Sequence, residues 1–531
     1  MPAFLSRRSF LATGLATAAV TTLPGGVAAA APKGGSNGSP RSGRLGEPFT
    51  LGLASGDPSP DGMVLWTRLA PVPLAEDGLG GVPQRVIPVQ WELAQDEGFR
   101  RVVRRGTEQT RPESAHSLHV ELQGLEPGRE YFYRFRAQGH LSEVGRTRTA
   151  PALDSRPDSL RMAFASCSQY EHGFFTAYRR LAEEEPELVL FLGDYIYEYT
   201  KQTYKISTGN VRDHAGPETE TLANYRQRYA QYKSDVDLQA AHAVAPWVVV
   251  FDDHEVDNNW ADEVPEKPEI PQPNFLQRRA VAFRAYYENM PLRRTSLPQG
   301  IDLQLYRRIQ WGQLANFHMM DTRQYRSDQA CGDGAKSGCA ERLDPARTIT
   351  GTEQERWLLD GLGASTSTWD VLGQQVFFAQ RDFALGPEQR VSMDGWDGYK
   401  ASRDRILTGI AARNVTNPVV LTGDVHRHYA NDLKADFDDP SSATVGVELV
   451  TSSITSTGDG SDQTPATDVQ LAENPHIKFA NTQRGYVSTL FSADQMRADF
   501  KVLPFVTRPD APVSTRASFV VEDGRPGLNP V

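Results

Sequence analysis

Four short apolar runs in this sequence each end in residues that can bind metal ions. Such runs, alternating with helix-like segments, predict an α/β fold. The four junctions, in chain order, are 162–166 followed by Cys167; 188–192 followed by Gly193, Asp194, Tyr195, Ile196 and Tyr197; 247–251 followed by Asp252, Asp253, His254 and Glu255; and 419–422 followed by Gly423, Asp424, Val425 and His426. Because open α/β sheets bind ligands beyond the carboxyl ends of their strands, these junctions converge on one site if the strands are neighbours in one sheet.

The side chains at these junctions combine hard and soft metal ligands. Asp194 and Asp424 each follow a glycine, which lets the backbone turn sharply while the carboxylate points into the crevice. Taken singly, either aspartate could instead cap a turn. Carboxylates suit Ca²⁺, Mg²⁺ or Fe³⁺, imidazole suits iron or zinc, and a phenolate or thiolate favours Fe³⁺. The mixture indicates more than one metal ion.

Composition and charge exclude two broad classes of protein. The chain has 531 residues, of which 39% are apolar and 23% charged, so it can bury a sizeable core and is not disordered throughout. Its formal net charge is −11, and no long run of lysine and arginine offsets this. Binding of nucleic acid over a broad surface is therefore not expected.

The first thirty residues have the pattern of a twin-arginine export signal. Arg7 and Arg8 precede Ser9-Phe10-Leu11, a short apolar run at 12–20 and an Ala-x-Ala pattern that predicts cleavage after Ala30. The alternative is a disordered basic start to a cytosolic protein. The signal predicts passage through the twin-arginine translocase, which carries folded proteins, often with a metal installed. We expect a secreted, periplasmic or cell-wall protein without a stable membrane anchor.

The three cysteines divide into a pair and a single residue. Cys331 and Cys339 bracket the glycine-rich sequence CGDGAKSGC, and in an exported protein this predicts a disulfide. Two free loop thiols are the alternative. Cys167 is left unpaired, which requires a separate explanation.

The patterning of the chain changes twice. Residues 31–47 are rich in glycine, serine and proline and predict a flexible leader. Residues 48–151 hold short β-prone runs separated by turns, which predicts an N-terminal β-sandwich with a fibronectin-type strand at 124–137. Residues 159–531 alternate strand and helix patterns and form the predicted α/β catalytic domain.

Several sequence blocks together resemble one known family. They are FASCSQY, FLGDYIYEY, WVVVFDDHEVDNNW, MMDTRQYR, QQVFFAQ, SMDGWDGYKA and VVLTGDVHRHY, and they run from about Phe49 to the C-terminus with FTLGLASGDP at the start. In this order they resemble the alkaline phosphatase D family of calcineurin-like metallophosphatases, relatives of the purple acid phosphatases. The resemblance implies a four-layer α/β/β/α body with an N-terminal fibronectin- or immunoglobulin-like sandwich, and a site with one Fe³⁺ and two Ca²⁺ ions.

The resemblance also implies roles for individual residues. Cys167, Tyr197 and His426 would bind iron, Asp194 would bridge metals and take part in catalysis, and Asp424 would bind calcium; His254 would be the catalytic proton donor. Asp253 stands where the wider superfamily has an asparagine, which leaves open whether Asp252 or Asp253 is the ligand. Asn258 is a further possible calcium contact, and Glu255, Asp257 and Asn259 are undecided. Read without the family, Cys167 could be an inert buried thiol, Tyr197 a core aromatic and either histidine an ordinary buried polar residue.

The reaction implied is hydrolysis of phosphomonoesters and phosphodiesters by a metal-activated hydroxide, which releases phosphate. Clustered cations cancel the repulsion between phosphate and hydroxide and align the attacking and leaving oxygens, while His254 or a calcium ion assists the leaving group. A diesterase like phospholipase D, known in the same family, is the nearest alternative. A calcium-binding surface module is a more distant one, because structural calcium loops have no use for histidine or cysteine.

A helical pattern over 274–290 carries several arginines. Phe275, Ala282, Tyr286 and Met290 recur at helical spacing. Their spacing leaves Arg278, Arg279 and Arg284 either to bind phosphate or to form a solvated face. The same alternatives hold for Arg323 and Arg427.

Overall fold

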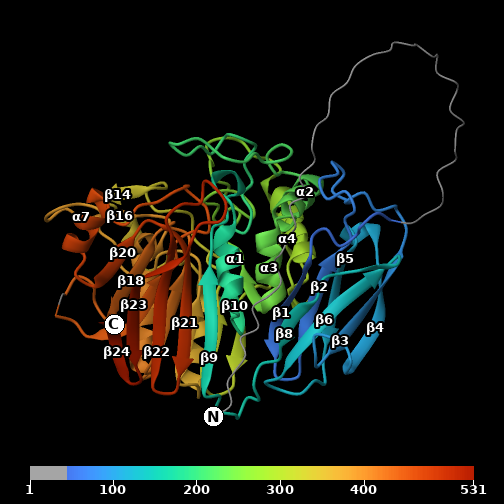
Figure 1. The fold of residues 1–531 in the computed structure, drawn as a ribbon. Coiled ribbons are helices and arrows are strands. Elements are labelled where there is room, and N and C mark those ends of the chain that lie inside the picture. The colour runs from blue at the N-terminus through green and yellow to red at the C-terminus, as the bar shows by residue number, and fades with distance from the viewer. Residues whose placement is uncertain (1–44, 440) are drawn as a thin grey trace, which may run out of the picture. The chain divides into compact units, whose positions relative to one another are not determined.

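Two large β-sheets form the body of the protein in the computed structural model, which describes residues 45–439 and 441–531. The predicted export signal, its cleavage after Ala30 and most of the predicted leader lie outside these residues. The larger sheet has ten strands in the order β24-β23-β22-β21-β9-β10-β11-β1-β2-β5 (Figure 1). Its strands are β1 (Leu53–Ser59), β2 (Gly62–Arg68), β5 (Ser117–Leu122), β9 (Ser159–Ala165), β10 (Leu188–Leu192), β11 (Pro246–Val250), β21 (Arg484–Ser492), β22 (Gln495–Leu503), β23 (Ser514–Glu522) and β24 (Arg525–Pro530).

The second sheet has seven strands in the order β12-β13-β15-β17-β19-β18-β20. They are β12 (Arg307–Trp311), β13 (Ala315–Met319), β15 (Trp369–Gly373), β17 (Pro418–Thr422), β18 (His428–Lys434), β19 (Thr444–Val450) and β20 (Ile477–Asn481). Strands β13, β15, β17 and β19 are parallel, as are β9, β10 and β11 in the larger sheet. One hydrophobic core contains residues of both sheets, for example Leu190 and Val248 with Val371 and Val419, so the sheets pack face to face.

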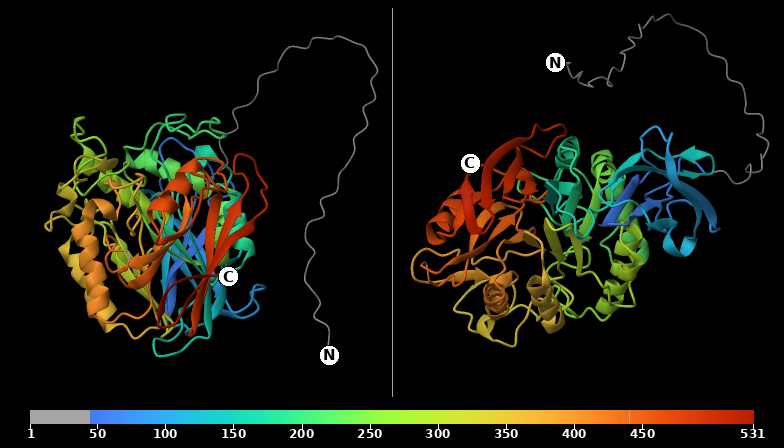
Figure 2. Two further views of the ribbon diagram at one scale, coloured as in Figure 1. Left: turned by 90° about the vertical axis from the view of Figure 1, so that its left-hand side faces the viewer. Right: turned by 90° about the horizontal axis from the view of Figure 1, so that it is seen from below.

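Helices cover the outer faces of the two sheets. Four pack against the larger sheet through the same core: α1 (Thr176–Glu183), α2 (Leu222–Lys233), α3 (Val236–Val244) and α4 (Phe275–Asn289). Two pack against the second sheet through a separate core: α5 (Gly351–Ala364) and α6 (Lys400–Ala412), at the periphery in Figure 2. With cover on both faces, every residue of β10, β11 and β17 is buried, which explains their uninterrupted apolar sequences. The last helix, α7 (Pro465–Glu473), lies next to β20.

The four predicted strand ends are present, but their strands do not share one sheet. Strands β9, β10 and β11 are neighbours in the larger sheet, whereas β17 belongs to the second sheet. The condition under which convergence was predicted, four neighbouring strands in one sheet, is therefore not met. The ends still meet because the two sheets approach closely there: Ser166 bridges Ser453, and a Cβ on Gly423 would lie 2.6 Å from the Ser166 hydroxyl.

The N-terminal strands form two layers, one of which continues the larger sheet. Strands β1, β2 and β5 belong to that sheet, and β1 pairs in parallel with β11. A separate sheet contains β3 (Ile87–Ala94), β4 (Val102–Thr110), β6 (Glu130–Ala137), β7 (His140–Leu141) and β8 (Gly145–Arg148). Side chains of both layers form one core, which also buries Leu45. The hydrogen-bonded larger sheet therefore continues from the α/β body into the N-terminal region.

Two further expectations can be compared with the structure. The helix predicted over 274–290 is α4, and the disulfide between Cys331 and Cys339 is formed while Cys167 is buried and unpaired. The disulfide loop contains β14 (Ala335–Ser337), which pairs with β16 (Arg390–Ser392). Across the described ranges, no helix is long and apolar enough to cross a membrane.

Candidate metal centre

The predicted ligands converge at the carboxyl ends of β9, β10, β11 and β17. Their donor atoms form three overlapping groups, within each of which all atoms lie no more than 4.8 Å apart. The groups are Cys167, Asp194 and His426; Asp194, Asp253 and His254; and Asp252, Asp253 and Asp424. Shared Asp194 and Asp253 join the three groups into one cluster. The structure therefore brings every predicted site residue of these loops together, including both predicted catalytic residues.

Tyr197 joins the cluster through its phenol oxygen. The hydroxyl of Tyr197 donates to Asp194 Oδ2 at 2.7 Å and lies 3.1 Å from His426 Nε2. Ser456 donates to the same oxygen at 2.7 Å. The phenol oxygen thus lies between two predicted ligands of the same metal.

The backbone at four of the predicted ligands is left-handed. The φ angles are 62° at Cys167, 58° at Asp194, 62° at Asp424 and 54° at His426. Each such residue costs about 1–3 kcal/mol and persists only where the surroundings hold it. Gly193, which precedes Asp194, has a φ of 105°, and a Cβ there would lie 2.4 Å from the Asp252 Cβ. Only glycine permits this approach of the two ligand loops, as the glycine-aspartate pattern suggested.

The carboxylates carry more negative charge than their surroundings compensate. Burial raises the pKa of Asp194 well above its ordinary value. The charge of His254 opposes this rise, but the charges of Asp253 and Asp252 add to it. Burial and the charges of Asp252 and Asp394 likewise raise the pKa of Asp424. Asp194 Oδ1 and Asp252 Oδ2 are buried and have no hydrogen-bond partner in the part of the chain that the structure describes. Bound cations would supply both the missing charge and the missing partners.

The sulfur and phenol donors also fit a cation. Burial raises the pKa of Cys167 and of Tyr197 well above their ordinary values, and in both cases the Asp194 carboxylate raises it further. Neither group would ionise in this environment by itself. A strongly Lewis-acidic ion favours the thiolate and phenolate forms, so the donor set fits the iron implied by the sequence.

Glu198 orients the predicted proton donor, His254. The Nδ1 of His254 lies 2.8 Å from Glu198 Oε2, and the backbone amide of Asn258 donates to the other carboxylate oxygen at 3.0 Å. Burial lowers the pKa of His254, but Glu198 and Asp253 outweigh this effect and raise it well above its ordinary value. The side chain of Asn258 donates to Glu266 at 3.0 Å. The sequence did not predict the contact between Glu198 and His254, although Glu198 lies in the block FLGDYIYEY that carries the family resemblance.

The three undecided residues of the segment 252–259 have structural partners. Glu255 accepts backbone N–H bonds from Asp194, Tyr195 and Asp252 at 3.1, 2.6 and 2.9 Å, which fastens the second ligand loop to the third. Asp257 pairs with Arg278 at 3.1 Å. The backbone amide of Asn259 donates to Asp253 Oδ2 at 2.8 Å.

Arg323 is the buried cation next to the carboxylates. It donates to Asp252 at 2.6 Å and to both oxygens of Asp394 at 2.8 and 3.0 Å, and it lies 3.9 Å from both Asp253 and Asp424. Its side chain is fully buried. Arg323 was left undecided on the sequence and Asp394 was not predicted, although they lie in the family-like blocks MMDTRQYR and SMDGWDGYKA.

The arginines of α4 belong to other contacts. Arg278 pairs with Asp257 and Glu218, Arg279 with Asp262, and Arg284 with Glu288. Arg278 and Arg279 are buried, so a solvated face is the wrong description of these two. None of the three has a hydrogen bond or ion pair to the predicted ligands among the contacts of the described residues.

The fold and the donor set together define a class of protein. Carboxylates, imidazoles, a thiol and a phenol meet at the carboxyl ends of strands from two face-to-face sheets. Such a set suits several multivalent cations, which hydrolases use to stabilise both the attacking and the leaving oxygen. The arrangement is that of a metal-dependent hydrolase.

Comparison with known proteins identifies the family within this class. Residues 162–500 match the PhoD-like phosphatase family, and residues 35–151 match the N-terminal domain of PhoD-like phosphatases. Alkaline phosphatase D of Bacillus subtilis (strain 168) is 53% identical over 484 residues, which cover 91% of this chain and 82% of that protein. A solved structure of PhoD, 52% identical, matches with a TM-score of 0.90 and covers 92% of this chain and 93% of its own. The chain therefore belongs to the PhoD-like phosphatase family and is a phosphoric ester hydrolase.

Proposed function

We propose that this phosphatase hydrolyses both phosphomonoesters and phosphodiesters by attack of water activated in a mixed iron and calcium centre. The observation that carries the proposal is the convergence of Cys167, Asp194, Tyr197, Asp253, Asp424 and His426 on one cluster, in which Asp424 and His426 are half-buried and the others buried. A centre of this composition favours water over a side chain as the nucleophile, because each candidate nucleophile in the cluster is also a ligand candidate.

The ligands divide between the two kinds of metal by their chemistry. Cys167, Tyr197 and His426 would hold Fe³⁺, Asp194 would bridge, and Asp424 would bind Ca²⁺. Asp253 is the better candidate for a second calcium ligand, because its donor atom belongs to two of the three groups. Asp252 is already engaged with Arg323, although its second oxygen is free of protein partners in the described chain. When bound, the ions supply positive charge that offsets the charge of the phosphate and lower the pKa of a bound water.

His254 and Glu198 would manage the proton of the leaving group. Glu198 holds the Nδ1 side of the imidazole at 2.8 Å, which leaves Nε2 to donate a proton to the departing alkoxide oxygen. The carboxylate raises the pKa of His254, which favours the protonated ring that a proton donor needs. A poor alkoxide leaving group requires this proton, whereas a nitrophenolate does not.

Chelation and one substitution test the proposal. Asp194→Asn should abolish hydrolysis of a nitrophenyl phosphate without unfolding the protein. Asp404→Asn on α6, whose carboxylate pairs with Lys400 and belongs to none of the ligand groups, should leave hydrolysis intact. Activity lost on treatment with a chelator should return with iron plus calcium and not with either alone. Unchanged turnover of the Asp194 variant, or full activity after chelation with no metal detected by elemental analysis, would reject the proposed centre.

Rates on three substrates separate the proposed activity from the phospholipid alternative. Initial rates are to be compared on a nitrophenyl monoester, a bis(nitrophenyl) diester and phosphatidylcholine. We expect both nitrophenyl esters to be hydrolysed. A preference for phosphatidylcholine over both would favour the phospholipase D-like activity instead.

The finer architecture and the export route are further parts of the proposal. We propose a four-layer α/β/β/α catalytic domain over residues 159–531 and an immunoglobulin- or fibronectin-like sandwich over 48–151, supported by the two sheets, their covering helices and the two-layered N-terminal strands. We also propose export through the twin-arginine translocase with residues 1–30 as signal and 31–47 as leader. Replacing Arg7 and Arg8 by lysine should retain the protein inside the cell, and the mature N-terminus should be Ala31.

A further inference from the structure

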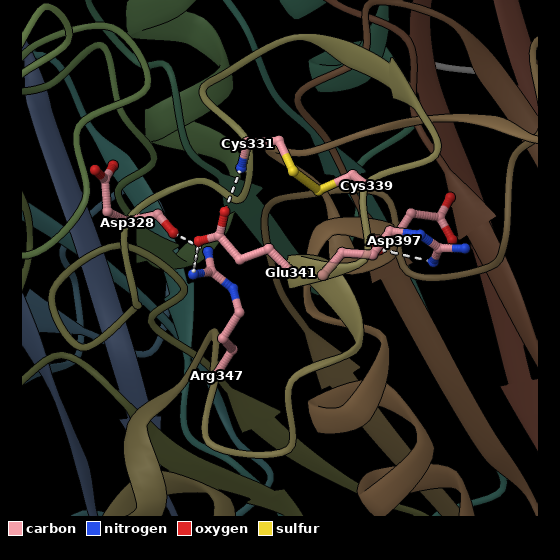
Figure 3. The surroundings of a disulfide bond; sticks show 7 residues. Asp328, Cys331, Cys339, Glu341, Arg347 and Asp397 are labelled. Carbon is pink, nitrogen blue, oxygen red and sulfur yellow. Dashed lines mark hydrogen bonds and ion pairs between the residues drawn. A yellow bond between two sulfur atoms is a disulfide. The ribbon is translucent and has the colours of Figure 1, made fainter.

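A disulfide closes a small ring next to the metal centre. Cys331 and Cys339 are joined, with their Cα atoms 6.2 Å apart (Figure 3). The backbone amide of Cys331 donates to Glu341 at 2.8 Å, and Glu341 pairs with Arg347 at 2.7 Å. Glu341, two residues after Cys339, therefore holds the Cys331 end of the ring and is itself held by Arg347.

One side chain inside the ring reaches a residue of the site. Asp333 Oδ2 accepts a hydrogen bond from the side-chain amide of Asn259 at 2.6 Å. The backbone amide of Asn259 in turn donates to Asp253 Oδ2 at 2.8 Å. Two hydrogen bonds thus connect the ring to a carboxylate that we propose as a calcium ligand.

The chain on either side of Asp333 contacts the same part of the site. The side-chain amide of Gln329 donates to the Asn259 carbonyl at 2.6 Å and to Asp394 at 3.0 Å. The backbone amide of Met393, next to Asp394, donates to the Gly334 carbonyl at 3.0 Å. The ring and the residues just before it therefore support both Asn259 and Asp394, which pairs with Arg323.

The second half of the ring is held by the pairing of β14 with β16, whereas residues 331–334, which include Asp333, lie outside that pairing. Gly332, Gly334 and Gly338 have φ angles of 71°, 89° and 65°, and a Cβ at any of them would meet nothing within 4 Å. Asp333 itself is exposed. A glycine-rich, exposed segment loses much conformational entropy when it is ordered, and closing the ring removes part of that loss.

We propose that Asp333 is a positioning residue for the calcium side of the metal centre and that the Cys331–Cys339 disulfide keeps it in position. Asp333 fixes the side chain of Asn259, and Asn259 fixes the Asp253 carboxylate. Opening the disulfide lets Asp333 leave Asn259, which loosens the Asn259 amide that donates to Asp253 Oδ2; the backbone amide of His254 still donates to Asp253 Oδ1 at 3.0 Å. This inference rests on the proposed function, because it concerns the calcium ligands of that centre.

Calcium affinity of the full-length exported protein is the measurement that tests the positioning role. Three variants are compared with wild type: Asp333→Ala, Asp333→Asn and the double variant Cys331→Ser/Cys339→Ser, with Lys336→Ala in the same ring as the matched control. Calcium binding is measured by titration after removal of calcium with EGTA, and iron is measured by elemental analysis. Loss of a partner that orients a metal ligand typically weakens metal binding about 10- to 100-fold.

We expect Asp333→Ala and the double cysteine variant each to weaken calcium binding about tenfold, with iron content unchanged. Asp333→Asn should retain most of the affinity, because its amide oxygen can still accept the Asn259 hydrogen bond. Combining Asp333→Ala with the cysteine variant should add little, since both remove the same support. At saturating calcium, kcat should return to the wild-type value.

Three results would overturn the proposal. They are wild-type calcium affinity in Asp333→Ala, equal weakening in Lys336→Ala, and joint loss of iron and calcium with a lowered melting temperature in the double cysteine variant. If the proposed function itself is wrong, wild-type activity will not depend on calcium, and this is visible in the wild-type titration alone.

Discussion

Replacing Arg323 by methionine tests whether a buried guanidinium balances the carboxylates of the centre. Arg323 donates to Asp252 and Asp394, and lies 3.9 Å from Asp253 and Asp424. At 3.9 Å and an effective dielectric constant of about 20, each of the two longer pairs attracts by about 4 kcal/mol before desolvation is counted. Methionine keeps the length of the side chain and removes the charge.

Proton uptake limits how much stability the variant can lose. An aspartate that loses its neighbouring cation can become protonated instead of staying charged. For an unfolded pKa of about 3.9, protonating it in the folded state costs about 4 kcal/mol of stability at pH 7 and about 1.5 kcal/mol at pH 5. Asp394 should contribute most of this change. Burial raises its pKa, but Arg323 and Arg326 outweigh burial and hold it below its ordinary value. For Asp252, burial raises the pKa to about 7 even with Arg323 present, so it adds little at neutral pH.

The sign of the pH dependence follows from Asp394. In the wild type its folded pKa lies below the unfolded value, so its contribution is present above about pH 4 and is lost only as the pH falls through the folded pKa. In the variant the folded pKa rises above the unfolded value, so stability is lost as the pH rises from about 4. Because Arg326 still pairs with Asp394 at 3.0 Å, we expect a loss of about 3 kcal/mol at pH 7 and about 1 kcal/mol at pH 5.

Urea unfolding of chelator-treated protein, followed by tryptophan fluorescence, measures the free energy of unfolding at both pH values. Arg356→Met, on the exposed face of α5, is the matched control and should change the free energy by less than about 0.5 kcal/mol. Adding calcium should reduce the deficit of Arg323→Met, since a bound cation replaces the lost charge. A loss that is equal at the two pH values, or below about 1 kcal/mol at pH 7, would refute the charge-balance argument.

Three other substitutions test separate features of the site. Glu198→Gln should lower kcat about 10²-fold on an alkyl phosphate but little on nitrophenyl phosphate. It should also move the alkaline limb of the kcat profile to lower pH, because the Glu198 carboxylate raises the pKa of His254. Equal losses of kcat on both substrates would contradict this role. Tyr197→Phe should remove visible absorption from the iron-loaded protein, and a colourless wild type would reject the phenolate ligand. Glu255→Gln should lower the free energy of unfolding by about 2 kcal/mol, because an NH₂ group replaces one carboxylate oxygen and cannot accept hydrogen bonds from the ligand-loop amides. An unchanged urea midpoint would contradict that role.

The ligands at strand ends could be predicted from the sequence because their signal is local. An apolar run followed by Gly-Asp or by Asp-Asp-His-Glu specifies a buried strand and the polar turn after it within ten residues. The pairing of strands is not local. Strands β11 and β17 are equally apolar on both faces, so nothing in their sequences indicates that they belong to different sheets.

The supporting residues could not be predicted, because their role depends on contacts between distant segments. Arg323 meets Asp252 and Asp394 across 71 positions of sequence in either direction. Glu198 meets His254 across 56 positions, and the position of Glu198 in FLGDYIYEY does not indicate this contact. The same limit applies to β1, whose parallel pairing with β11 joins the N-terminal region to the body.

A buried glutamate supports the ligand loops in each of the two sheets. In the larger sheet, Glu255 binds the backbone amides at Asp194 and Asp252. In the second sheet, Glu448 accepts hydrogen bonds from the amide of Phe378 at 2.8 Å and from the hydroxyl of Thr422 at 2.7 Å, two residues before Asp424. Both glutamates are buried, so their hydrogen bonds are shielded from water.

These paired supports explain how left-handed ligand residues persist on both sides of the site. Each half of the centre is fixed within its own sheet, and the close approach of Gly423 to Ser166 sets the distance between the halves. A substitution that enlarges Gly423 therefore separates the two halves without changing a single ligand. We infer that the geometry of the metal centre is determined by the packing of the two sheets as much as by the ligands themselves.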